Sequence, residues 1–342
     1  MEQILLLLHT DESGSLSKPA CEAVTAARNL VCSLKGAAWS VGLVGSEIER
    51  AARSLAACGA GRFLGVSGEE FGASRYASDA AAAETLCRAT GATLILAPAT
   101  ARFNRCLAGV AQRAGGRIDT HATGLEAVNG ALQVQRWYYR QRVEATLSRT
   151  QRPWFVLLDP GSAPAWSAEP GEAAIERLPV ELPDTARRTS VLGFQTPEAG
   201  EQTIRPDAPL LFVAGAGWTK KQPDGQTHVE EAARLILDFV RKNQASLGSS
   251  KSLVDLAGEG QAVLPFLTHL HQVGQTGSTP RHPKGLATCC HGEEPHVVGW
   301  RFIGERRAIN LDPNCGWARG KADVLYVADA FEVLRRVLDL LG

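Results

Sequence analysis

The N-terminal part of the chain alternates between short apolar runs and longer stretches that have apolar residues at helical spacing. Ile4 to Leu8 is a continuous apolar run, which predicts a buried strand, and a helix is expected from about 18 to 34. Strands are then expected over 39–44, 62–66 and 93–97, and helices over 47–57 and 77–89. Strands that alternate with helices predict βαβ units, and therefore a mainly parallel, doubly wound α/β sheet with helices on both faces.

After Gly116 the apolar residues recur at every second position, which is typical of half-buried strands. We expect these strands to close one edge of the first domain. Trp137, Tyr138 and Tyr139 fall in this region, and we interpret them as sheet packing, with cofactor contacts as the alternative. The expected strands are 131–134, 136–142, 145–147 and 154–158.

Prolines concentrate between residues 160 and 209, where eight of the 17 prolines occur. Because proline lacks a backbone N–H, this density argues against regular structure and indicates a connection between domains. A chain of 342 residues is long enough for two domains, each with its own core. We therefore expect an N-terminal α/β domain over 1–159, a proline-rich connection over 160–206 and a C-terminal α/β domain over 207–342.

The second domain is expected to open with a strand over 210–214 that runs into the glycine turn Gly215-Ala216-Gly217. Thr227 and Glu230 have the spacing of a capping box, and apolar residues at helical spacing follow them. A strand, a glycine turn and a helix form a phosphate-binding arrangement. A tight turn without a ligand is, however, the more common explanation of Gly-x-Gly.

Composition excludes several classes of partner. The hydrophobic content of 44% and the charged content of 21% are those of a soluble globular protein. The 36 basic and 36 acidic residues balance, so the basic excess that nucleic acids and anionic membranes require is missing. The apolar run near the N-terminus is too short for a membrane span or a signal peptide, and we expect a cytoplasmic location. The 8 cysteines form no Cys-x-x-Cys pair, so we expect reduced, mostly buried thiols.

The candidate chemistry gathers near the C-terminus. Residues 272–277 read Gln-Val-Gly-Gln-Thr-Gly, in which the glycines permit close approach of a ligand while Gln275 and Thr276 offer polar groups. An ordinary glycine-rich surface loop is the alternative. Two later apolar runs, which predict buried parallel strands, lead to Asn310 and Asp329. Open α/β sheets bind nucleotides at the carboxyl ends of such strands.

Two further segments carry polar groups of interest. Ser250 and Lys251 precede an apolar stretch, and a hydroxyl and a cation at a helix start suit a pyrophosphate, although a simple N-cap by Ser249 or Ser250 is the alternative. Five side chains of the loop over 289–296 could be interpreted as a metal cluster, but the loop lacks a spaced second pair, so we expect no metal. These five are Cys289, His291, Glu293, Glu294 and His296.

In order and nearly in spacing, these pieces resemble the C-terminal FAD-binding domain of the electron transfer flavoprotein alpha subunit. The resemblance spans the whole chain, with Ala97-Pro98-Ala99-Thr100 matching in the first domain, but it is strong only from Leu247 onward. It implies that Gln275, Thr276 and His296 face the isoalloxazine ring. It also implies that Ser250 and Lys251 bind the pyrophosphate and that Asn310 and Asp329 bind the adenosine. The expected FAD-binding residues are Ser250, Lys251, Gln272, Val273, Gly274, Gln275, Thr276, His291, Gly292, His296, Asn310 and Asp329.

The resemblance also implies a function. An alpha subunit of this family pairs with a beta subunit, holds FAD mainly in its C-terminal domain, takes electrons from flavoprotein dehydrogenases and passes them to a quinone oxidoreductase. It is a carrier and transforms no substrate itself. Two alternatives remain, namely a nucleotide-binding enzyme on the same fold, with His291 as the attractive acid or base, and a cofactor-free scaffold subunit.

The sequence departs from the family pattern in two places. His291 and Pro295 replace a serine and a glutamine, and Ala216 stands where the family commonly has an arginine between two glycines. A cation near the flavin favours its reduction, so the missing arginine predicts a lower potential for the first electron. His291, or Lys220 and Lys221 beyond the turn, could restore part of that charge.

Overall fold

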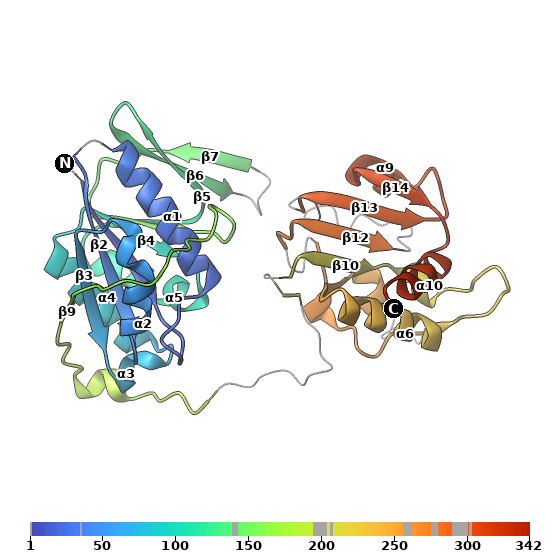
Figure 1. The fold of residues 1–342 in the computed structure, drawn as a ribbon, viewed down its shortest axis with the longest axis horizontal. Helices are drawn as coiled ribbons and strands as arrows, with labels where there is room; N and C mark the ends of the chain where they lie inside the picture. The colour runs from blue at the N-terminus through green and yellow to red at the C-terminus, as the bar shows by residue number, and fades with distance from the viewer. Residues whose placement is uncertain are drawn as a thin grey trace. The chain divides into compact units, whose positions relative to one another are not determined.

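The computed structural model describes the chain except residues 1, 35, 139–142, 194–203, 206–207, 256–261, 275–279, 289–299 and 301–302. The chain divides into two compact units, Met1–Phe194 and Gln195–Gly342. Each unit is an α/β structure built around its own sheet, as Figure 1 shows. The predicted fold class is therefore confirmed, and the division falls within the proline-rich stretch.

The first unit has a nine-stranded sheet. Its strands are β1 (Gln3–His9), β2 (Ala38–Gly45), β3 (Arg62–Ser67), β4 (Leu94–Pro98), β5 (Arg117–Val128), β6 (Ala131–Tyr138), β7 (Val143–Leu147), β8 (Trp154–Leu158) and β9 (Ile175–Arg177). They lie in the order β7-β6-β5-β8-β4-β1-β2-β3-β9. The pairs β5–β6 and β6–β7 are antiparallel, and the remaining pairs are parallel.

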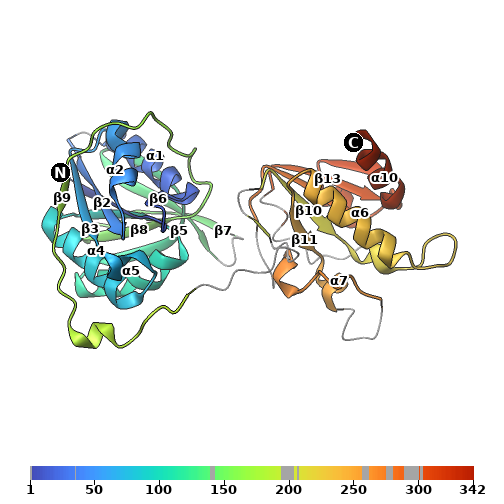
Figure 2. The same ribbon diagram turned by 60° about the horizontal axis from the view of Figure 1, so that its bottom comes forward.

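Helices cover both faces of this sheet. The α-helices are α1 (Lys18–Ser33), α2 (Glu49–Leu55), α3 (Glu69–Gly72), α4 (Tyr76–Thr90) and α5 (Ala101–Arg113), and the 3-10 helices are η1 (Ala56–Cys58) and η2 (Asp184–Arg187). Side chains of β1 alternate between two cores: Leu6 packs with α1 and α2, and Leu5 packs with α4 and α5. Figure 2 shows these two helical layers on opposite sides of the sheet. This alternation explains why β1 is continuously apolar from Ile4 to Leu8, since both of its faces are buried there.

Three expectations for the first unit were wrong. The strands expected over 131–134 and 136–142 are one strand, β6, as far as Tyr138, because Gln135 continues its antiparallel pairing with β5 and β7, and residues 139–142 lie outside the described residues. The strand β8 does not belong to the antiparallel edge but runs parallel between β4 and β5. The proline-rich stretch is not wholly irregular, since β9 pairs with β3.

The second unit has a five-stranded sheet in the order β11-β10-β12-β13-β14, and its pairs are all parallel. Its strands are β10 (Leu210–Ala214), β11 (Ser246–Ser249), β12 (Lys284–Thr288), β13 (Glu305–Asn310) and β14 (Val324–Val327). Its helices are η3 (Ala216–Thr219), α6 (Val229–Lys242), α7 (Lys251–Asp255), η5 (His269–His271), α9 (Gly316–Lys321) and α10 (Ala330–Leu340). One face packs on α6 and α10, and the other packs on Trp300 and α9.

The capping box predicted at Thr227 and Glu230 is wrong. The N-cap of α6 is His228, which makes no side-chain capping bond, and Glu230 lies within the first helical turn. The His228 ring instead contacts the Asp224 carboxylate, with Nε2 and Oδ2 2.7 Å apart. The helix therefore begins one residue later than a Thr227 cap would place it.

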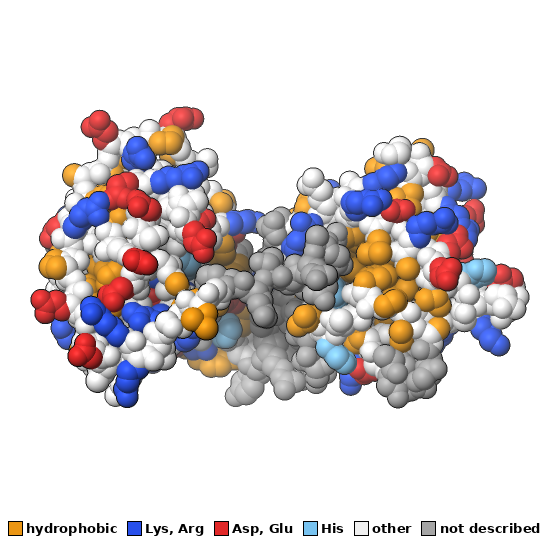
Figure 3. All heavy atoms as spheres, turned by 90° about the horizontal axis from the view of Figure 1, so that it is seen from below, with side chains coloured by type: hydrophobic (Ala, Val, Ile, Leu, Met, Phe, Trp, Pro, Cys, Tyr) orange, Lys and Arg blue, Asp and Glu red, His pale blue; other side chains and the backbone are white. Residues whose placement is uncertain are grey.

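The thiols are less buried than expected, since three of the six described cysteines, Cys58, Cys106 and Cys315, are buried. Basic and acidic side chains are interspersed on the face shown in Figure 3. The described cysteines are free, and burial raises the pKa of the Cys87 and Cys106 thiols to about 12, which keeps them unreactive. Among the described residues, no helix is both long and apolar enough to cross a membrane.

Candidate functional site

The parallel strands of the second unit bring the described candidate residues to one edge of the sheet. Ser250 directly follows β11, Asn310 ends β13, and Asp329 follows β14. Because these strands run in the same direction, their carboxyl ends share this edge. The chain passes from β10 to β11 on one side of β10 and returns to β12 on the other. Such a reversal of strand order is a topological switch point, where open α/β sheets bind ligands.

A parallel bridge joins two of the predicted segments. Ser249 pairs with Gln272, and the Val273 N–H donates to the Ser249 carbonyl oxygen at 3.0 Å. The Ser250 N–H donates to the carbonyl oxygen of Ala214 at 2.8 Å, which ties the same segment to the end of β10. The structure thus joins Ser249, the residue before Ser250, to Gln272 and Val273.

Gly248 permits this close approach. A Cβ atom at Gly248 would lie 2.8 Å from Cγ2 of Val273, which is closer than non-bonded carbon atoms tolerate. The resulting junction is closely packed, since Ser250 is 2% exposed and Gln272 is 4% exposed. Position 248 therefore has a packing reason to be glycine, in addition to any close approach of a ligand.

The polar atoms at this junction suit a nucleotide. Ser249 Oγ is buried and has no hydrogen-bond partner among the described residues. Buried hydroxyl groups are normally satisfied, so Ser249 Oγ is a group that a bound molecule could pair. The Lys251 side chain is 52% exposed, with Nζ 3.7 Å from Asp255 Oδ2, so its ammonium lies at the surface of the same edge.

Ser250 has a structural role as well. Its Oγ accepts a hydrogen bond from the Leu253 N–H at 3.2 Å, which is the N-cap contact that the sequence allowed as an alternative. Its pyrophosphate role therefore stays a prediction. The helix that follows, α7, is only 5 residues long.

A second part of the edge forms a cavity of about 290 Å³ beside β13 and β14. Asn310 and Asp329 both line this cavity, and Lys220 and Lys221 line it from the loop after η3. The Ala328 N–H donates to the Asn310 carbonyl oxygen at 3.3 Å, which holds the two strand ends together. The structure thus brings together the two residues predicted to bind adenosine and adds two lysines that sequence reasoning had named only as cations beyond the turn.

The turn after β10 is anchored to the end of β12. Trp218 is fully buried, and its Nε1–H donates to the Thr288 hydroxyl at 2.8 Å. That hydroxyl in turn donates to the Val213 carbonyl oxygen at 3.1 Å. Ala216, at the start of η3, is 4% exposed. The position at which the family commonly has an arginine is therefore enclosed in this anchored turn.

Several predicted site residues lie outside the described residues. These are Gln275, Thr276, His291, Gly292 and His296. The weighed metal cluster over 289–296 lies there as well. Within the part of the chain that the structure does describe, no group of three or more His, Cys, Asp or Glu side chains is arranged to hold a metal.

The fold and the site define a class: a two-unit α/β protein with a candidate ligand site at the switch point of its second sheet. Comparison with known proteins gives the family. The sequence model described as "Electron transfer flavoprotein domain" matches residues 4–183, so the chain belongs to this family. The chain is also 26% identical, over 327 residues, to the "Electron transfer flavoprotein subunit alpha" of Thermoanaerobacterium thermosaccharolyticum. That similarity covers 94% of this chain and 92% of the relative, and it makes the chain a divergent, alpha-subunit-like member.

Proposed function

We propose that this chain is the alpha subunit of an electron transfer flavoprotein, an FAD-dependent electron carrier between flavoprotein dehydrogenases and a quinone oxidoreductase. The observation that carries the proposal is the junction of Ser249 and Ser250 with Gln272–Gly274 at the switch point of the second sheet. The similarity to an alpha subunit over 94% of the chain supports the same function. In this proposal the two domains are the units Met1–Phe194 and Gln195–Gly342, and the location is cytoplasmic.

We assign the candidate residues to the parts of FAD as the resemblance implies. Ser250 and Lys251 at the end of β11 would bind the pyrophosphate. Asn310, Asp329 and the neighbouring lysines would hold the adenosine in their cavity. Gln272 to Thr276, with His291, Gly292 and His296, would line the isoalloxazine ring.

When bound, FAD supplies the redox chemistry, because it accepts and releases electrons without a change in the protein's own covalent bonds. The chain would bind and orient the cofactor, and its buried junction would limit the access of water to it. A carrier of this kind needs no general acid or base from the protein.

The beta subunit is the expected partner, and one experiment tests the pair and the cofactor together. We would co-express this chain with its beta subunit, purify the complex by size-exclusion chromatography and titrate it with a chemical reductant while recording absorption. The proposal predicts a one-to-one heterodimer with a flavin spectrum that bleaches stepwise. A stable, fully flavinated monomer would contradict the partnership, and a colourless heterodimer would contradict the carrier function.

A further inference from the structure

The first unit contains a cavity of about 680 Å³ that the proposed carrier function does not use. It lies at the carboxyl ends of β1 and β4. The strands β2 and β3 follow β1 on one side of it, and the chain then crosses to form β4 on the other side of β1. This is the topological switch point of the first sheet, the position at which α/β sheets bind small molecules. The side chains that carry the argument are His9, Asp11, Glu12, Thr100 and Arg102.

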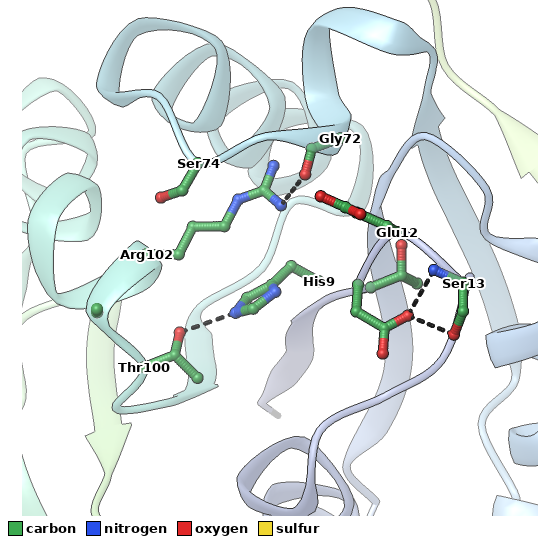
Figure 4. Close-up of a pocket in the computed structure, with 10 residues that line it drawn as sticks. His9, Glu12, Ser13, Gly72, Ser74, Thr100 and Arg102 are labelled. Atoms are coloured by element: carbon green, nitrogen blue, oxygen red, sulfur yellow. Dashed lines mark hydrogen bonds between the residues drawn. The ribbon is translucent and has the colours of Figure 1, made fainter. Parts of the chain in front are cut away.

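One wall of the cavity is positively charged. The Arg102 side chain is 5% exposed, and its Nε–H donates to Asp79 Oδ1 at 2.8 Å while Nη1 donates to the Gly72 carbonyl oxygen at 3.3 Å. Nη1 carries two N–H groups, and among the described residues only Gly72 accepts from it. Figure 4 shows this guanidinium at the cavity wall, between Ser74 and His9.

His9 lies at the same wall, and its pKa is shifted there. Its Nε2 lies 2.9 Å from the Thr100 hydroxyl oxygen. Burial first, and then the positive charge of Arg102, lowers the pKa of His9 to about 4, so its ring is neutral at neutral pH. The Arg102 guanidinium, although paired with Asp79, is near enough to His9 to contribute to this shift, and the N-terminus of α5, a helix of 13 residues, adds positive potential at the same wall.

The facing wall is negatively charged. Asp11 Oδ1 accepts hydrogen bonds from the Ser13 N–H at 2.9 Å, the Ser13 hydroxyl at 2.7 Å and the Ser15 N–H at 2.9 Å. These bonds lower the pKa of Asp11, which keeps the carboxylate ionised, and Oδ2 accepts no hydrogen bond from the residues that the structure describes. Glu12 follows it, and Figure 4 shows Glu12 and Ser13 across the cavity from Arg102 and Thr100.

From these two walls we infer that the cavity binds a small zwitterion, whose acidic group contacts Arg102 and Thr100 and whose ammonium group contacts Asp11 and Glu12. An anion without an ammonium group would face the two carboxylates, and a cation without an acidic group would face the guanidinium. A molecule with both charges is attracted at both ends. The site involves no residue of the second unit, so it is independent of the proposed flavin site.

A matched set of ligands tests the charge pattern on the full chain. We would use isothermal titration calorimetry with 5-aminovalerate, glutarate and cadaverine, which have similar lengths but are zwitterion, dianion and dication. The expected result is that the zwitterion binds at least about tenfold more tightly than the other two. Tighter binding of glutarate or cadaverine would overturn the inference. The ω-amino acids from glycine to 6-aminohexanoate vary the distance between the two charges of the zwitterion. If none of them binds, the inference is also overturned.

A matched pair of variants tests the acidic wall. Asp11→Asn removes the charge but keeps a carbonyl oxygen that can accept the three loop hydrogen bonds, so the fold is retained. It should weaken binding of the zwitterion about tenfold. Glu181→Gln removes the same charge at an exposed position that does not line the cavity, and it should leave binding unchanged. Equal affinity of the Asp11→Asn variant and the parent chain would contradict the proposed contact.

Discussion

Val273 donates its backbone N–H to the carbonyl oxygen of Ser249 at 3.0 Å, and this bond joins the segment after η5 to the end of β11. The two segments are separated along the chain but meet at the edge where the second sheet reverses its strand order. A ligand at this edge would contact both segments at once. The junction is therefore the part of the structure on which the proposed flavin site depends most.

Gly248→Ala tests this junction. Its Cβ would lie 2.8 Å from Val273 Cγ2, so Val273 has to move, and overpacking of this kind costs about 1–3 kcal/mol. We expect a lower unfolding free energy of the second unit and loss of FAD during gel filtration of the heterodimer. The control is Gly61→Ala, where the added Cβ would lie 3.7 Å from the Trp39 carbonyl oxygen, an ordinary contact. Full retention of FAD by Gly248→Ala would show that the junction does not hold the cofactor.

Asp329 allows capping and ligand binding to be separated. Its Oδ1 accepts the Glu332 N–H at 2.9 Å and so caps α10. Asp329→Ala should lower the unfolding free energy by about 1 kcal/mol and also weaken FAD binding. Asp329→Asn keeps a capping oxygen and removes the charge, so it should preserve stability and weaken FAD binding alone. If both variants bind FAD like the parent chain, Asp329 does not contact the adenosine.

His9 predicts a pH dependence of stability in the first unit. Its pKa is lowered from 6.5 to about 4 by burial and by Arg102, so the unfolded chain binds a proton that the folded chain excludes. The unfolding free energy is therefore unaffected by protonation of His9 above about pH 6.5. As the pH falls from there toward about 4, the unfolded chain takes up the proton and the unfolding free energy decreases, by at most about 3 kcal/mol. His9→Gln should flatten the dependence between about pH 7 and about pH 5, measured by denaturant unfolding. An unchanged slope in the variant would mean that other groups cause it.

Ala216→Arg tests the electrostatic consequence of the missing arginine. Ala216 starts the anchored turn after β10 and is 4% exposed. A cation there should raise the potential of the first electron on the bound flavin, on the order of 60 mV. Ala216→Gln brings a long polar side chain without the charge and should leave the potential near that of the parent. Equal potentials for the arginine and glutamine variants, in redox titrations of the heterodimer, would reject this account.

Most of the fold could be predicted because its central strands are buried on both faces, whereas β14, which was also expected to be buried, is a largely exposed edge strand. The runs that form β1 and β10 are continuously apolar, so their limits were expected to within a residue. The strand order could not be predicted, because the position of β8 between β4 and β5 depends on long-range pairing that no local pattern encodes. The helix α5 was missed, although Thr100 caps it and Phe103, Cys106, Leu107 and Val110 have helical spacing.

The candidate residues could be proposed from the ends of predicted strands and from the resemblance, but the side chains that share a cavity with them could not. Nothing in the local pattern of Lys220 and Lys221 indicates that they share a cavity with Asn310, because the loop that carries them reaches β13 through tertiary packing. The same is true of His9 and Arg102, which come from different strand–helix connections. Polar groups that follow buried strands were the usable signal. Which of them meet was decided by the strand order.

The central claim is that this chain holds FAD at the carboxyl edge of its second sheet. The most direct test is to denature the co-purified heterodimer, identify the released cofactor by chromatography, and repeat the measurement with the Asp329→Ala and Gly248→Ala variants. The account predicts stoichiometric FAD from the parent pair and a clear loss from both variants, which should still form heterodimers. Release of no flavin from the parent pair, or undiminished FAD from both variants, would contradict it.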